Sequence, residues 1–250
     1  MNVSYIITHR SDKGSRDRNL SLVLDWLMPL GFEVIVVEQD SEPRVQEQVE
    51  LKGANYIFAF NDGIFNKSWA VNIGINAATH DLIFCGDNDM ILPLEALQKA
   101  IDLLKSGVES VKPFTRLIDL TRFQTMLYSV SRFFASFPFR RRQFACFCSG
   151  IVAFTRKCLK DIGGWDERFR GWGAEDDAVS VKLKRLNKKT VVLPYTCHHL
   201  HHSRTKFDKN KHANYENNVK LLNELESMDN LKDLAQPTTT QGDLNKYKKL

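Results

Sequence analysis

Short apolar segments alternate with segments of helical pattern in the first third of the chain, and this alternation constrains the fold more than any other feature. Four apolar segments are predicted to be strands: residues 3–8, 33–38, 55–60 and 81–85. Between them, residues 19–30 and 69–78 carry a helical pattern. Continuous apolar strands separated by helices are typical of a parallel sheet with both faces covered. The sequence therefore predicts an α/β fold.

Each of the four predicted strands ends in a polar turn. His9 and Arg10 follow the first strand, and the other turns contain Asp40, Asp62 and the segment 86–89. Ligands of such sheets bind outside the carboxyl ends of the strands. These turns are therefore the first place to expect a binding site.

The rest of the chain is less regular. Its predicted elements are helices at 93–106, 175–186 and 212–228 and strands at 149–155 and 190–193. A chain of 250 residues can bury one substantial core. We therefore expect a single domain over residues 1–228, followed by a polar tail at 229–250 with little core of its own.

The composition sets broad limits. Lys and Arg number 35 against 30 Asp and Glu, a formal charge of +5 that suits an enzyme for an anionic substrate and equally a solvated surface. The five cysteines are odd in number and lack C-x-x-C spacing, which disfavours a disulfide framework or structural zinc site and favours a reducing compartment. No run approaches the roughly 18 apolar residues of a spanning helix. We expect a cytoplasmic protein, or one peripheral to a membrane.

Residues 123–147 are rich in Phe and Arg. Basic and aromatic side chains suit an anionic interface, so this segment is a candidate for contact with a membrane or an acceptor. A core-facing helix with a solvated basic end is the alternative, and the pattern favours it.

Asp87 and Asp89 lie two residues apart directly after an apolar strand. In a tight turn both carboxylates can approach one hard cation, which prefers oxygen ligands. The spacing alone is weak, and the position at the end of a strand is what gives it meaning. An EF-hand loop is excluded because its glycine and closing glutamate do not follow at the required offsets.

The segment 171–177 reads GWGAEDD. Glycines allow a close backbone turn, and acids at the start of a helix are favoured by its dipole. One acid is enough for a cap, so three acids beside Trp172, with Trp165 just upstream, indicate a site. Indole rings stack on the apolar faces of sugars; a buried core position is the alternative for each tryptophan.

Four histidines occur in the five residues 198–202, a pattern typical of metal binding. On a regular strand His199 and His201 face one side, and His198 and His202 the other. At most half can therefore meet one ion unless the chain bends, and we expect one or two ligands.

Three blocks of the sequence resemble nucleotide-sugar glycosyltransferases with the GT-A fold, in particular the β-1,4-galactosyltransferase type and family 2 enzymes of capsule and polysaccharide synthesis. Residues 65–74 (FNKSWAVNIG) are similar to the family's F-N-R-x-x-x-x-N-x-G helix, with Lys67 in place of Arg. Residues 86–93 look like its D-x-D segment. Residues 149–177 resemble its S-G-x-x…G-W-G-G-E-D-D block, with Ala174 in place of the second Gly. The resemblance spans roughly residues 3–204.

The resemblance implies a GT-A (Rossmann-like) fold with a mostly parallel central sheet flanked by helices. Residues 1–92 would bind the nucleotide sugar, with a leaning to UDP, and residues 93–228 a glycan or glycolipid acceptor; no nucleic-acid partner is implied. The expected metal ligands for Mn²⁺ or Mg²⁺ are Asp89, His202 and His199, the last standing where galactosyltransferases have Met.

The resemblance also assigns roles at the strand ends and in the acidic block. The expected donor-binding residues are Thr8, Arg10, Asp40, Asp62, Phe65, Lys67, Asp87 and Asn88. Asp176 would be the general base, and the expected acceptor-binding residues are Trp165, Trp172, Glu175 and Asp177. A single base opposite the leaving group implies one displacement with inversion.

Three other functions fit part of the pattern. A sugar-nucleotide pyrophosphorylase should carry a Gly-rich loop after the first strand, where residues 9–14 contain one Gly. A glycosidase would use two carboxylates but would not explain the D-x-D segment and the histidines. A non-catalytic carbohydrate-binding protein would keep its ligand after loss of the metal-binding acids.

Overall fold

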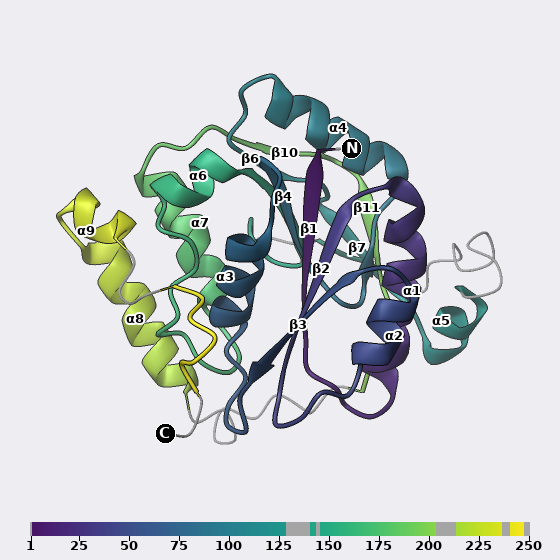
Figure 1. Cartoon of the computed structure of the whole chain (residues 1–250). Coiled ribbons are helices and arrows are strands. Elements are labelled where there is room, and N and C mark those ends of the chain that lie inside the picture. The colour runs from purple at the N-terminus through teal and green to yellow at the C-terminus, as the bar shows by residue number, and fades with distance from the viewer. Residues whose placement is uncertain (1, 129–140, 144–145, 204–213, 237–240, 248–250) are drawn as a thin grey trace.

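The computed structural model describes residues 2–128, 141–143, 146–203, 214–236 and 241–247, the side chains of 141–143 excepted. Its central sheet has seven strands in the order β10-β6-β9-β4-β1-β2-β3 (Figure 1). Neighbouring strands are parallel except where β9 pairs with β4 and β6. The strands are β1 (Val3–His9), β2 (Glu33–Asp40), β3 (Asn55–Phe60), β4 (Leu82–Asp87), β6 (Ser110–Lys112), β9 (Ile151–Thr155) and β10 (Thr190–Val192). The predicted mostly parallel α/β sheet is confirmed.

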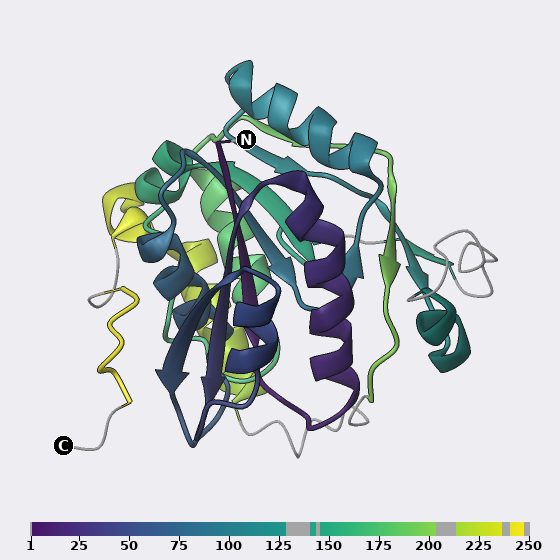
Figure 2. The same ribbon diagram turned by 45° about the vertical axis from the view of Figure 1, so that its right-hand side comes forward.

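Helices cover both faces of this sheet (Figures 1 and 2). One core forms against α1 (Ser15–Leu27), α2 (Gln46–Leu51) and α4 (Leu94–Lys105), and the short helix η1 (Met28–Leu30) follows α1. The other core forms against α3 (Lys67–Ala77), α6 (Arg156–Asp161) and α7 (Glu175–Arg185). Outside α7 lie α8 (Tyr215–Ser227) and α9 (Leu231–Ala235), which pack in a third, smaller cluster.

The central strands are apolar throughout because both of their faces are covered. All seven residues of β1 are buried, alternately in the two cores. On the α3 face, Gly74 lies so close to β1 that a Cβ atom would overlap the Ile6 side chain. Glycine at this position lets α3 lie directly on the sheet, which brings the start of the helix to the carboxyl edge.

A second sheet of four short strands was not predicted. Its order is β5-β11-β7-β8, with β5 (Met90–Ile91), β7 (Arg116–Asp119), β8 (Arg141–Gln143) and β11 (Thr196–His199). The strands are two to four residues long, too short for a period-2 pattern to stand out. This sheet continues from the end of β4 and carries the histidines.

Residues 229–250 differ from the expected tail with little core. Leu234 of α9 is buried, and the described residues 241–247 pack on α3. The Trp69 indole donates a hydrogen bond to the Asp243 carbonyl at 2.9 Å, and the Tyr247 ring meets the Trp69 ring edge-on at 4.8 Å. The polar composition hid these contacts because most of them are hydrogen bonds.

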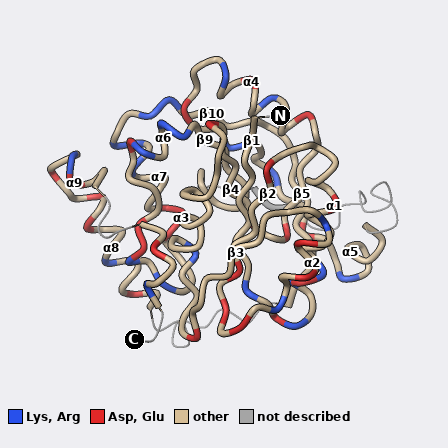
Figure 3. Tube along the Cα trace, viewed as in Figure 1, with Lys and Arg blue, Asp and Glu red and all other residues tan. Residues whose placement is uncertain are grey.

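Most of the Phe/Arg-rich segment 123–147 lies outside the described residues. Its first part belongs to α5 (Arg122–Tyr128), where Phe123 and Met126 are exposed while Thr125 and Tyr128 are buried. Membrane or acceptor contact through the segment stays a prediction. No helix in the described part of the chain is long and apolar enough to cross a membrane. Basic and acidic residues are interspersed around the trace (Figure 3).

Candidate active site

The polar turns at the carboxyl edge of the central sheet converge as expected. Thr8 at the end of β1 is in register with Asp87 at the end of β4. Three residues later the chain enters β5, whose Met90 pairs antiparallel with His199 of β11. This pairing brings the histidines of the small sheet beside Asp89.

Asp89, His199 and His202 form a candidate metal site. One Asp89 oxygen lies 3.3 Å from His202 Nε2 and 3.6 Å from His199 Nε2. The three candidate ligand atoms all lie within 4.8 Å of one another. Because β11 ends at His199, the chain bends before His202, and two side chains that a regular strand would separate converge. Two of the four histidines therefore lie beside Asp89 as candidate ligands.

Asp119 holds one of these histidines in place. It is the register partner of His199 across β7 and β11, and its carboxylate lies 2.8 Å from His199 Nδ1. A carboxylate on the second ring nitrogen is the usual orienting contact of a metal-binding histidine, since it leaves Nε2 for the ion. Asp119 is a site residue that the sequence interpretation missed, because β7 itself was not predicted.

The charges of this cluster suit a divalent cation. Burial opposes protonation of His199, but hydrogen bonds to Asp119 and Asp89 outweigh it and raise its pKa to about 9. Burial likewise opposes ionisation of Asp89, yet His199 and His202 lower its pKa. Both shifts arise because the carboxylates attract the positive charge of the protonated histidines. A bound cation with nitrogen and oxygen ligands would take the place of that positive charge. The residues present therefore fit Mn²⁺ or Mg²⁺.

Lys67 joins two carboxylates on the other side of the edge. Its ammonium lies 3.1 Å from an Asp87 oxygen and 3.2 Å from both oxygens of Asp176. Lys67 is the first residue of α3, where the Asn66 side chain caps the helix by accepting from Trp69 N–H at 2.9 Å. Asp176 lies in the first turn of α7. Two helix starts therefore face each other beside the end of β4.

Two acids of this region, Glu175 and Asp176, have raised pKa values. Burial raises the pKa of Asp176, and the Asp87 charge adds to this while Lys67 opposes it. Burial and the charge of Asp176 raise the pKa of Glu175 to about 7. Carboxylates whose pKa is moved toward neutrality suit proton transfer at physiological pH.

The loop before α7 has a strained backbone. Gly171 and Gly173 have φ of 74° and 105°, and Ala174 has φ of 71°, in the left-handed region that disfavours side chains. The Glu175 carboxylate accepts from Gly173 N–H at 3.0 Å, and Gly171 N–H donates to the Phe65 carbonyl at 2.7 Å. These bonds tie the loop both to α7 and to the segment that precedes α3.

The predicted acceptor-binding tryptophans have different environments. Trp172 is 57% exposed and stacks on Tyr215 at a centroid distance of 6.0 Å. Trp165 is 1% exposed and meets Phe154 edge-on in the core. A ring at that depth cannot stack on a sugar, so the acceptor role predicted for Trp165 is corrected to a packing role. Tyr215, the half-buried stacking partner of Trp172, was not identified from the sequence.

Two predicted donor-binding residues form hydrogen bonds within the protein. Arg10 donates to the carbonyls of Gln39, Asn61 and Gly63 at 2.7 to 2.9 Å. Its guanidinium also lies 5.4 Å from the Phe65 ring centre. Asn88 is buried, with its amide 2.6 Å from His9 Nδ1. Both side chains hold the turns in place instead of pointing outward.

The remaining predicted donor residues lie along the edge in two groups. Thr8, Lys67, Asp87 and Asp176 line one small void. Asp40 lies 3.5 Å from the Arg44 guanidinium and accepts from Ser41 N–H at 2.7 Å. Asp62 is exposed in the next turn. The residues around Lys67 therefore enclose a small charged void, whereas Asp40 and Asp62 lie in the more open turns beside it.

Comparison with known proteins gives a consistent assignment. A family model described as "Glycosyl transferase family 2" matches residues 15–163, and one described as "N-terminal domain of galactosyltransferase" matches residues 129–206. Among curated proteins, none matches the chain.

Solved structures with the same fold include two glycosyltransferases. Glucosyl-3-phosphoglycerate synthase from Mycobacterium tuberculosis, in complex with Mn²⁺, UDP and phosphoglyceric acid, has a TM-score of 0.56 at 14% identity and covers 95% of this chain and 80% of that chain. The catalytic domain of Drosophila β1,4-galactosyltransferase 7, in complex with xylobiose, has a TM-score of 0.55 at 13% identity and covers 92% and 82%. At this identity the likeness shows the shared GT-A fold.

Proposed function

We propose that this chain, which belongs to glycosyltransferase family 2 because that family model matches more than half of it, transfers a sugar from a UDP-sugar to a hydroxyl of a glycan or glycolipid with inversion. The observation that carries the proposal is the juxtaposition of a metal-type cluster and a buried carboxylate–lysine group. Asp89 belongs to the metal-type cluster, and Asp87, two residues earlier, belongs to the carboxylate–lysine group. Such a pair of sites is what a metal-dependent displacement of a diphosphate requires.

The donor would bind at the open edge of the sheet. Asp89, His199 and His202 would hold Mn²⁺ or Mg²⁺, which supplies positive charge against the departing diphosphate. Thr8, Asp40, Asp62, Phe65, Lys67 and Asp87 would contact the nucleotide, while Arg10 and Asn88 keep the surrounding turns in shape. The related structure with bound UDP and Mn²⁺ supports this choice of donor.

Asp176 would be the general base. A sugar hydroxyl is a poor nucleophile, so a carboxylate must take its proton as it attacks the anomeric carbon. The raised pKa of Asp176 makes this carboxylate a better proton acceptor than an exposed aspartate. Trp172, Glu175 and Asp177 would contact the acceptor. One base and no enzyme nucleophile give a single displacement, hence inversion.

A cytoplasmic location, at a membrane surface or away from it, is part of the proposal. The five cysteines are free thiols in the structure, which suits a reducing compartment.

A thermal-shift screen of UDP-, GDP- and CDP-sugars, each with and without Mn²⁺, tests the function. A ligand that binds only the folded state at 100 times its Kd stabilises it by about 2.7 kcal/mol. We expect UDP-sugars to raise Tm only when Mn²⁺ is present, and release of UDP to follow on longer incubation. If no nucleotide sugar raises Tm, the proposal is wrong; if one raises Tm without any turnover, a binding protein is the better description.

A further inference from the structure

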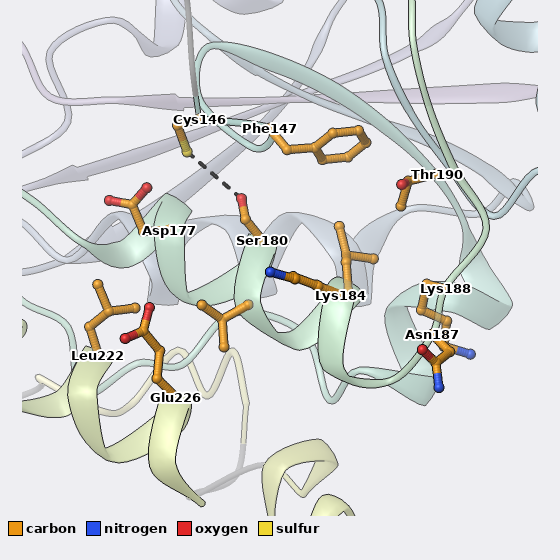
Figure 4. A pocket seen from close by; sticks show the side chains of 12 residues that line it. Cys146, Phe147, Asp177, Ser180, Lys184, Asn187, Lys188, Thr190, Leu222 and Glu226 are labelled. Atoms are coloured by element: carbon orange, nitrogen blue, oxygen red, sulfur yellow. Dashed lines mark hydrogen bonds between the residues drawn. The ribbon is translucent and has the colours of Figure 1, made fainter.

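A long cavity of about 840 Å³ runs along the outer face of α7 (Figure 4). Phe147 and Cys146 lie on one side of it, and Leu222 and Glu226 of α8 lie on the other. Its volume falls in the range of ligand-binding cavities, which is about 300–1,000 Å³. Of the residues given a role above, only Asp177 lines this space.

The cavity begins at the catalytic end of α7. Asp177 lines it, one residue after the proposed base Asp176. One turn further, the Ser180 hydroxyl donates to the Asp176 carbonyl at 2.9 Å and lies 3.7 Å from the Cys146 sulfur. One end of the cavity therefore lies next to Asp176 in the first turn of α7.

The cavity follows α7 for about two turns and continues past the end of the helix. Asp177, Ser180, Val181, Leu183 and Lys184 line it from α7, and Asn187, Lys188 and Thr190 line it beyond Arg185, where the helix ends. The seven residue steps from Asp177 to Lys184 rise about 10 Å. This length exceeds that of a single sugar ring and suits a short chain of linked sugars.

The walls combine apolar surface with separated polar groups. Phe147 and Leu222 supply apolar faces from opposite sides. The exposed polar side chains are Lys184, Asn187, Thr190 and Glu226, and none of them makes a side-chain hydrogen bond within the described part of the chain. Sugars present apolar ring faces and a rim of hydroxyls, so they match this alternation.

The charge of the cavity disfavours a polyanion. The Lys188 ammonium at the far end is already neutralised, at 3.1 Å from Glu109 and 2.6 Å from Asp161. Lys184 is then opposed by the acids Asp177 and Glu226. The remaining charges leave no cationic surplus for a phosphorylated or strongly acidic ligand.

We propose that this cavity binds the body of the acceptor, which is an uncharged oligosaccharide of at least two or three sugars whose terminal hydroxyl reaches Asp176. The proposal rests on the proposed function and names the acceptor class for that same site. It assigns Lys184, Asn187, Thr190 and Phe147 to acceptor binding. A single sugar or a small phosphorylated acid would leave the cavity unused.

A glycan array carrying uncharged mono- to hexasaccharides, probed with the full chain in the presence of UDP and Mn²⁺, tests this inference. Two variants fill the cavity from different elements: Lys184→Trp on α7 and Thr190→Trp on β10. Lys99→Trp, at an exposed position of α4, is the matched control. We expect the wild type to retain oligosaccharides but not their component monosaccharides. Both cavity variants should lose at least about tenfold in affinity, or 1.4 kcal/mol, and the control should lose nothing.

Hydrolysis of a UDP-sugar without acceptor separates the two levels of the proposal. It should proceed at the same rate in the wild type and in the control Lys99→Trp, because Lys99 lies on α4, outside the cavity, the metal cluster and the Asp176 group. Suppose that the wild type hydrolyses the UDP-sugar. The inference alone is then overturned if the wild type retains no glycan, if it retains monosaccharides as strongly as oligosaccharides, or if both cavity variants retain glycans as well as the wild type does. Absence of hydrolysis by the wild type with every nucleotide sugar would overturn the proposed function itself.

Discussion

The metal cluster and the carboxylate–lysine group share one edge of the sheet but are held in different ways. His199 is fixed by strand pairing on both sides, with Met90 and with Asp119. Asp176 and Lys67 instead stand at the first turns of two helices. The loop before Asp176 contains three residues at positive φ. The first group is positioned by hydrogen-bonded backbone, and the second by charge pairing and a strained turn.

This difference corresponds to two tasks. A cation needs ligands at fixed distances, and paired strands provide them before the ion arrives. A general base must exchange a proton and meet a substrate, so its pKa and its local strain matter more than rigid placement. The comparison predicts that changes in the metal cluster act on donor and metal affinity. Changes around Asp176 should act on rate, pH dependence and stability.

The largest effect is expected at Lys67. Lys67→Met removes the cation that opposes the raised pKa of Asp176. The pKa of Asp176 should rise further, so the base is protonated at higher pH and the acid limb of the kcat/KM profile moves up. Transfer at pH 7 should fall by about tenfold or more, measured as UDP release across pH 5–9. Lys67→Arg, the residue in the family pattern, should restore the profile. Superimposable pH profiles of Lys67→Met and the wild type would show that the charge of Lys67 does not set the pKa of Asp176.

An effect of similar size, on metal affinity instead of rate, is expected at Asp119. Asp119→Asn keeps the shape of the side chain but removes the negative charge on His199 Nδ1. Loss of such an orienting carboxylate lowers metal affinity by about 10- to 100-fold. Calorimetric titration of Mn²⁺ into protein with UDP should show this loss, with Asp102→Asn on the exposed face of α4 as the control. Equal Mn²⁺ affinity in both variants would mean that strand register alone fixes the histidine.

The smallest effect is expected at Ala174. A non-glycine residue in the left-handed region destabilises the folded state by about 1–2 kcal/mol. Glycine also gives the unfolded chain more freedom, which lowers the gain in the free energy of unfolding by about 0.4–1 kcal/mol. Ala174→Gly, at φ 71°, should therefore raise the free energy of unfolding in urea by up to about 1 kcal/mol. Ala178→Gly, inside α7, should lower it by about the same amount or more. A loss of stability in both variants would show that the turn is not strained.

The two regions also differ in how far the sequence could predict them. The central strands were predictable because burial on both faces makes them continuously apolar. The acidic loop before α7 was predictable because glycines and three acids stand together. The small sheet was not, since its strands are too short for a pattern, and Asp119 was missed with it. Convergence of His199 and His202 on Asp89 depends on a bend that residue alternation alone does not show.

Three residues predicted to bind ligands also make contacts within the protein. Arg10, Asn88 and Trp165 have side chains that suit ligands, but each also suits an internal partner. Arg10 meets three backbone carbonyls, Asn88 meets His9, and Trp165 meets Phe154. The partners of Arg10 and Asn88 lie 29 to 79 residues away along the chain, so only the fold reveals these contacts. The packing of residues 241–247 on α3 escaped prediction for the same reason.

Side-by-side measurement of UDP binding with Mn²⁺ and of sugar transfer in Asp176→Asn and Asp89→Ala tests the central claim most directly. Asp176→Asn should bind UDP with unchanged affinity and transfer about 10²- to 10⁴-fold more slowly, the usual contribution of a general base. Asp89→Ala should lose Mn²⁺-dependent UDP binding. Wild-type transfer by Asp176→Asn, or undiminished Mn²⁺-dependent UDP binding by Asp89→Ala, would contradict the assignment of a base to one group and the metal to the other.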